Sequence, residues 1–70
     1  MKKKLTRRQA QVLQGFAEGK QVKKLAYEMG VTPRGIRDIA RRACKRAGVA
    51  TLPQLMYEYA RNEITNTFQL

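Results

Sequence analysis

Histidine is absent from this chain of 70 residues, and cysteine occurs once, at Cys44. Without histidine the usual zinc ligand sets cannot be assembled, and a single cysteine excludes a disulfide within the chain. Acids are scarce too, because 5 Asp and Glu stand against 15 Lys and Arg, which gives a formal net charge of +10. A charge balance of this kind indicates a polyanion as the partner.

Long apolar runs are also missing. No stretch is long enough to cross a membrane, and the basic start at residues 1–4 is not followed by the apolar segment of a signal peptide. We therefore expect a soluble, cytoplasmic chain with no membrane partner. Its length allows one domain with one small core, because a chain of this size buries only roughly 60% of its unfolded surface on folding.

Catalysis is not expected, because general acid–base chemistry needs titratable groups that converge on one site. The acids are instead dispersed along the chain, at Glu18, Glu28, Asp38, Glu58 and Glu63. Cys44 has basic neighbours, but its place near the expected core edge favours packing over nucleophilic chemistry. The sequence therefore predicts a protein that is not an enzyme and that uses no cofactor or metal.

Glycine and proline divide the chain into segments whose apolar residues recur at helical spacing. Four helices fit between these breaks, at about residues 6–19, 21–29 and 33–47, with the last one starting at about residue 52. No segment reads as a strand, so we predict an all-α fold. Residues 65–70 form a tail that either frays or packs back through Phe68 and Leu70.

Capping signals support these boundaries. The segments Thr6–Gln9 and Thr51–Gln54 both have the spacing of a capping box. Thr32 is placed as an N-cap, with Pro33 at the first helical position. Gly30 is expected to end the second helix in a left-handed conformation.

The apolar faces of the four helices define the expected core. In chain order its members are Leu5, Val12, Leu13, Phe16 and Ala17; Val22, Leu25, Ala26 and Met29; Ile36, Ala40, Ala43 and Ala47, with Ile39 at the edge; and Leu52, Leu55, Met56, Tyr59 and Ala60.

The predicted third helix carries its charged residues and its apolar residues on opposite sides. Its small and aliphatic residues share the core side, at about 100° per residue. The opposite side holds Arg34, Arg37, Asp38, Arg41 and Lys45, with Arg42 and Arg46 on one flank. Residues 33–47 carry a net charge of +5, as do residues 1–8, and only one acid is interspersed in the helix. This favours the phosphate-lined major groove, which admits a single α-helix, over a merely solvated face.

Ala26, Gly30 and Ile36 have the spacing of the small residue, the turn glycine and the buried aliphatic residue of a helix-turn-helix motif. Over about residues 5–64 the chain resembles the LuxR/FixJ/GerE family of DNA-binding domains without a gap. The resemblance is carried by Leu5-Thr6, Arg8, Val12-Leu13, Ala17-Glu18-Gly19, Lys23, Leu25-Ala26, Met29-Gly30-Val31-Thr32, Ile36-Arg37 and Gly48-Val49. Residues 31–46 also resemble the DNA-reading helix of sigma-factor region four.

The LuxR-type resemblance implies a four-helix domain whose third helix is the recognition helix and whose fourth helix mediates dimerisation. Carried over position by position, it implies base contacts by Arg37, Asp38 and Arg41. The phosphate contacts that it implies are Lys23, Thr32, Arg34 and Gly35, and the basic face of the helix adds Lys45. Arg37 and Arg41 are expected to donate to guanine, while Asp38 accepts from cytosine or orients an arginine.

We therefore expect a sequence-specific transcriptional regulator that binds double-stranded DNA, is bacterial or phage-encoded, and is associated with the nucleoid. Residues 1–4 form a basic arm, 5–64 the DNA-binding domain and 65–70 the tail. A homodimer is expected through the fourth-helix residues Leu52, Leu55, Met56 and Tyr59, for which core packing is the alternative.

A receiver or sensor domain is not expected, so that the domain stands alone. One competing hypothesis is a small interaction protein that pairs with a larger LuxR-type regulator or with RNA polymerase. Another is a binder indifferent to nucleic-acid sequence, in which Lys2, Lys3 and Lys4 matter most.

Overall fold

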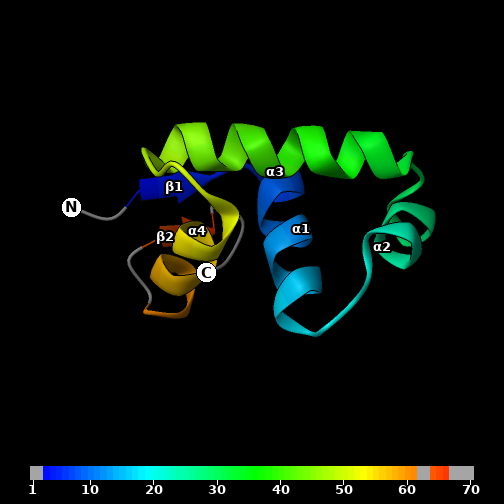
Figure 1. The fold of residues 1–70 in the computed structure, drawn as a ribbon, viewed down its shortest axis with the longest axis horizontal. Helices are drawn as coiled ribbons and strands as arrows, with labels where there is room; N and C mark the ends of the chain where they lie inside the picture. The colour runs from blue at the N-terminus through cyan, green and yellow to red at the C-terminus, as the bar shows by residue number, and fades with distance from the viewer. Residues whose placement is uncertain (1–2, 62–63, 67–70) are drawn as a thin grey trace.

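The protein folds into four helices around a small core, in a computed structural model that describes residues 3–61 and 64–66. Along the chain the elements are β1 (Lys3–Leu5), α1 (Arg7–Ala17), α2 (Val22–Met29), α3 (Pro33–Ala47), α4 (Leu52–Ala60) and β2 (Ile64–Asn66). Figure 1 shows α3, the longest element, running along one side of the molecule, with the other three helices beneath it. The predicted four-helix, all-α class is confirmed.

The helix boundaries follow from local hydrogen bonds. The hydroxyl of Thr6 accepts from the backbone N–H of Gln9 at 3.2 Å, and the side-chain oxygen of Gln9 accepts from the N–H of Thr6 at 3.1 Å. This is the reciprocal capping box that the spacing predicts. Gly30 and Gly48 end α2 and α3 with φ of 70° and 75°, in the left-handed region that glycine tolerates best.

The first and last described segments, β1 and β2, pair in a short parallel sheet, so the expectation that no segment is a strand is wrong. Lys3 pairs with Ile64, and Leu5 pairs with Asn66. Three-residue strands are too short to show an alternating pattern, and this pairing forms only after α4 has brought the chain back to β1. Phe68 and Leu70, the expected anchors of the tail, lie outside the described residues.

Arg46 fastens this sheet to α3. Its Nε–H group donates to the carbonyl oxygen of Lys4 at 2.7 Å, across 42 positions of sequence. The bond gives a backbone carbonyl group of the edge strand β1 a side-chain partner. Arg46 therefore has a structural role in addition to its charge, and it holds the chain just before α1 against the flank of α3.

Two clusters of buried side chains form the core, and α3 contributes to both. Ile36 and Ala40 pack with the residues of α2, whereas Ala43 and Ala47 pack with those of α4 and β1. The alanines let α3 lie close to its neighbours, because little bulk separates the backbones. The recognition-helix candidate is thereby held rigidly along its length.

Most of the expected core is confirmed, with corrections at helix ends. Fully or nearly fully buried are Leu5, Val12, Leu13, Leu25, Ala26, Ile36, Ala40, Ala43, Ala47 and Leu55. Ala17 and Ala60 are exposed, because each is the last residue of its helix and lies beyond the packed part. Gln9 and Ala10 are buried without having been expected, and the capping box satisfies the side-chain oxygen of Gln9.

Replacing either of two glycines inside helices by alanine should change the stability of the protein, in opposite directions at the two positions. A methyl group at Gly35 would meet its nearest atom, the hydroxyl of Thr32, at 3.4 Å, whereas one at Gly15 would lie 2.7 Å from the side chain of Leu25. We expect Gly35→Ala to stabilise the protein by about 0.5–1 kcal/mol through helix propensity. Gly15→Ala should destabilise it, because buried Leu25 must leave its rotamer at a cost of roughly 1–3 kcal/mol.

Thermal unfolding followed by circular dichroism measures both changes against the wild type. A rise in melting temperature for both variants would contradict the close contact between α1 and α2.

Candidate nucleic-acid interface

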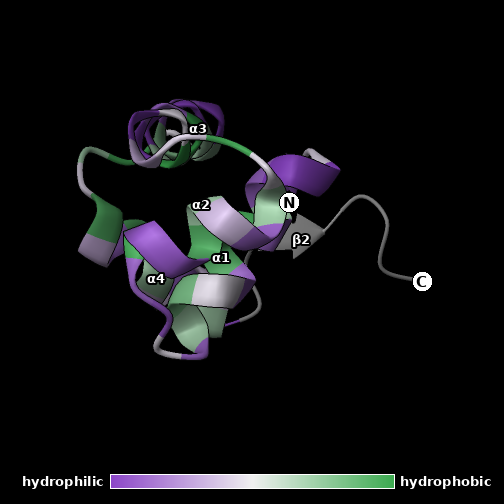
Figure 2. Ribbon diagram, turned by 90° about the vertical axis from the view of Figure 1, so that its right-hand side faces the viewer, coloured by the Kyte–Doolittle hydropathy of each residue, from purple (hydrophilic) through white to green (hydrophobic). Residues whose placement is uncertain are grey.

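The outer face of α3 is basic and exposed. Arg34, Arg37, Arg41 and Lys45 are exposed, whereas Ile36, Ala43 and Ala47 on the inner face have no exposed surface. Figure 2 views α3 nearly end-on and shows its hydrophilic residues turned away from the other helices. The sidedness that the helical periodicity predicts is therefore present.

Four side chains of this face line one open hollow, which we call the central hollow. It has a volume of about 470 Å³ and is formed by Arg34, Arg37, Asp38 and Arg41. They come from two successive turns of one helix, so the spacing along the sequence is enough to bring them together. Three guanidinium groups and one carboxylate leave the hollow positively charged.

Asp38 orients Arg41. An Nη2–H group of Arg41 donates to Oδ1 of Asp38 at 2.7 Å, one helical turn away. An exposed pair of this kind adds little stability, but it restricts the directions that the guanidinium samples. Of the two roles expected for Asp38, orienting an arginine is thus the one visible in the free protein.

Glu18 and Glu28 do not neutralise the α3 face. Lys20 Nζ lies 2.7 Å from Oε1 of Glu28 and 3.4 Å from Oε1 of Glu18, so both carboxylates are used at the connection between α1 and α2. Within the part of the chain that the structure describes, Arg34 and Arg37 have no ion pair. The face therefore keeps a charge that a polyanion can neutralise.

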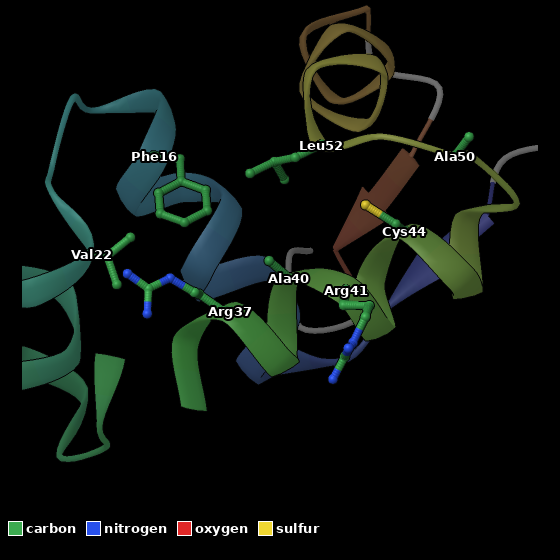
Figure 3. A pocket seen from close by; sticks show the side chains of 8 residues that line it. All are labelled: Phe16, Val22, Arg37, Ala40, Arg41, Cys44, Ala50 and Leu52. Atoms are coloured by element: carbon green, nitrogen blue, oxygen red, sulfur yellow. The ribbon is translucent and has the colours of Figure 1, made fainter. Parts of the chain in front are cut away.

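Arg37 and Arg41 diverge. Figure 3 shows Arg37 directed towards Val22, at the start of α2, and Arg41 directed away from it. Between α3 and the other helices lies an apolar groove of about 400 Å³, which Arg37 and Arg41 border. Its other lining residues are Phe16, Val22, Ala40, Cys44, Ala50 and Leu52. Because the two guanidinium groups point in different directions, they can reach different partners.

The candidate phosphate contacts lie around this face. Lys23 is exposed on the first turn of α2, the helix that precedes α3. The backbone N–H of Gly35 donates to the hydroxyl of Thr32 at 3.0 Å. That amide is thus already engaged, whereas the Thr32 hydroxyl proton remains a donor. Gly35 can contribute only by its lack of a side chain, which allows close approach of a ligand.

The α4 residues expected at a dimer interface lie in or against the core. Leu55 has no exposed surface, and Leu52, Met56 and Tyr59 are half-buried beside it. A side chain without exposed surface cannot contact a second protomer unless α4 leaves the core. For Leu55 the structure therefore shows the alternative, core packing. Dimerisation itself stays a prediction.

Tyr57 is an α4 side chain that the sequence predictions assign to no site. It is 60% exposed, and an Nη1–H group of Arg61 donates to its hydroxyl at 2.9 Å. Helical periodicity alone places it outside the apolar face. That position is the signal that would have marked it as the large exposed residue of α4.

A second hollow lies on the other flank of α3, and we call it the lateral hollow. It has a volume of about 190 Å³ and is lined by Thr6, Arg8, Gln9, Ile39 and Arg42. Arg42 was expected on a flank of the helix, but its closeness to Arg8 depends on how α1 packs on α3. No sequence pattern reports that packing.

Other kinds of site find little support in the described residues. Burial raises the pKa of the Cys44 thiol, which disfavours the nucleophilic thiolate. Residues 3–61 and 64–66 contain no group of three His, Cys, Asp or Glu side chains placed to hold a metal ion. None of the helices described there is long and apolar enough to span a bilayer.

Comparison with known proteins points in the same direction. The sequence model of the family described as bacterial regulatory proteins, luxR family, matches residues 3–58. The match begins in β1 and ends within α4, so it spans the central hollow and the lateral hollow. No curated protein and no solved structure matches this chain.

Proposed function

Because this chain belongs to the luxR family of bacterial regulatory proteins, we propose that it controls transcription by reading a specific DNA sequence with α3 in the major groove. Helix-turn-helix domains of this family bind DNA, which makes the protein a DNA-binding regulator in general terms. The finer proposal concerns which residues read bases, which hold phosphates, and in what assembly.

The observation that carries the proposal is the central hollow. A major groove about 12 Å wide admits one α-helix, and the base edges lie along its floor. The exposed arginines of α3 stand on a side that none of the described elements covers, while the alanine side anchors the helix. In the DNA complex, Arg37 and Arg41 donate to O6 and N7 of guanines, and Asp38 holds Arg41 in place.

Phosphate contacts set the register of the helix in the groove. Lys23, Arg34 and Lys45 are exposed cations around α3, and the Thr32 hydroxyl lies at its N-terminus. Such contacts hold the protein on DNA without reading sequence. Gly35 lets the backbone approach closely, since it carries no side chain.

A homodimer would give this small domain two recognition helices. One such helix covers few base pairs, whereas two can read half-sites about 34 Å apart, one turn of DNA. We place the contact on the exposed surface of α4 around Tyr57, since Leu55 is enclosed in the core.

Selection of bound sequences from a random duplex pool tests the function. We expect enrichment of a motif with guanines, repeated in inverted orientation at one-turn spacing if the protein binds as a dimer. A pool left unchanged after several rounds, although duplex DNA is bound, indicates a binder without sequence preference. If DNA is bound only after a partner protein is added, the interaction hypothesis is supported instead.

A further inference from the structure

Arg8 of α1 and Arg42 of α3 line the lateral hollow, on the flank of α3 away from the apolar groove. We propose that these two arginines bind a phosphate group of the DNA backbone, on the strand opposite to the one that Lys23 contacts. This rests on the proposed function and extends it, because neither residue belongs to the contacts inferred above.

The lateral hollow has a net positive charge that a bound anion would neutralise. No acid lines it, and neither guanidinium group has an ion pair or hydrogen bond within the described residues. The side-chain oxygen of Gln9 accepts from the N–H of Thr6, so it is not free to solvate a guanidinium group. Two like charges bordering one hollow repel each other, and a phosphate between them removes that repulsion.

The position of the lateral hollow fits the second strand of a duplex. An α-helix about 10–12 Å across fills the major groove, so the phosphates of both strands border its two flanks. Arg37 and Val22 mark one flank, where α2 begins and Lys23 follows. Arg42 marks the other flank, where Figure 1 shows the N-terminal end of α1 meeting α3.

The fold holds the lateral hollow in shape. The bond from Arg46 to the carbonyl oxygen of Lys4 ties the chain to α3 four residues before Arg8. The capping box then fixes the first turn of α1, which carries Arg8. The two arginines are thus presented by two helices that are joined independently of DNA, which lowers the entropy lost when a phosphate binds.

The salt dependence of DNA binding tests this site. Each phosphate contact contributes about 0.9 to the slope of log affinity against log salt concentration. Because the two arginines share one phosphate, we expect the double variant Arg8→Gln with Arg42→Gln to lose about 0.9 of that slope. Between 50 and 200 mM salt, the wild type would then lose about 3.5-fold more affinity than the double variant.

The titrations are followed by fluorescence anisotropy with the selected duplex and with a scrambled duplex of equal length. The reduction in slope should be the same on both, since phosphates carry no sequence information. Lys20→Gln is the matched control, because Lys20 is a cation at the connection between α1 and α2 that lines neither the central nor the lateral hollow. Its slope should equal that of the wild type, and circular dichroism confirms that all variants are folded.

Uncharged methylphosphonate linkages locate the phosphate. When they replace the phosphates that border the Arg42 flank, wild type and double variant should bind with equal affinity. Linkages on the other strand should leave their difference intact. Titration with inorganic phosphate tests whether the hollow binds a free anion instead of DNA. If the wild type binds inorganic phosphate at millimolar concentration and the double variant keeps the wild-type salt slope for DNA, the proposal is overturned.

Different experimental results would overturn the proposed function and the phosphate site. A wild type that binds no duplex overturns both the proposed function and the phosphate site. A wild type that selects a sequence, with a double variant of unchanged slope, overturns the phosphate site alone. A double variant that loses sequence preference but keeps the wild-type slope also refutes it, because the arginines would then act on bases.

Discussion

Arg37→Ala is expected to weaken binding to the selected duplex by about 1–3 kcal/mol, while binding to a scrambled duplex falls by much less. Arg37 is exposed and carries no ion pair within the described residues, so the substitution removes the proposed base contact without disturbing the core. Competition titrations at a fixed salt concentration give the ratio of the two affinities. That ratio should fall, and the selected motif should relax at one base pair.

Lys23→Ala is the matched comparison. Lys23 is also exposed but lies on α2, where we infer a phosphate contact. Its loss should weaken both duplexes alike and reduce the salt slope by about 1. Equal losses on the two duplexes for Arg37→Ala would show that Arg37 does not read bases.

Leu55→Ala is expected to cost about 2–5 kcal/mol of folding stability, the range for removing a fully buried leucine. Natural domains have roughly 0.05–0.15 kcal/mol of stability per residue, so a chain of this length has little margin. We expect a large fall in melting temperature or partial unfolding at 25 °C. Urea unfolding followed by circular dichroism measures the change in free energy.

The dependence on protein concentration separates the two roles considered for Leu55. If Leu55 acts only in the core, the lost stability is the same at low and high concentration. An interface residue would instead show a loss that grows with concentration, because dimers are stabilised by mass action. Tyr57→Ala should leave monomer stability within about 0.5 kcal/mol, since the side chain is mostly exposed.

The same Tyr57→Ala variant tests the assembly. If α4 forms the dimer contact through its exposed surface, sedimentation of the variant should shift towards the monomer. An unchanged dimer would place the contact elsewhere, and a wild type that sediments as a monomer with and without DNA would rule out the homodimer.

The structural features that could be predicted from the sequence are those that local interactions determine. The cap of α1 depends on Thr6 and Gln9, three positions apart, and the start of α3 depends on Thr32 and the residues directly after it. The central hollow belongs to the same class, since all its residues lie on two turns of one helix. For these features, spacing along the chain and position in space carry the same information.

Contacts between distant segments could not be predicted from the sequence. The pairing of β1 with β2, and the bond from Arg46 to Lys4, join residues tens of positions apart. The closeness of Arg8 to Arg42 arises in the same way, from the packing of α1 on α3. Helical periodicity shows which residues share a face, but not which other helix lies against that face.

The sequence predicts the four helices, the threonine N-caps of α1, α3 and α4, the glycine ends of α2 and α3, and the basic outer side of α3. These features depend on neighbours within about four residues. The folded protein alone shows that Leu55 is enclosed in the core, that Arg46 holds the N-terminal strand, and that two arginines from different helices border one hollow. The physical reason is that burial and charge proximity depend on how helices pack, and many packings satisfy the same periodic pattern.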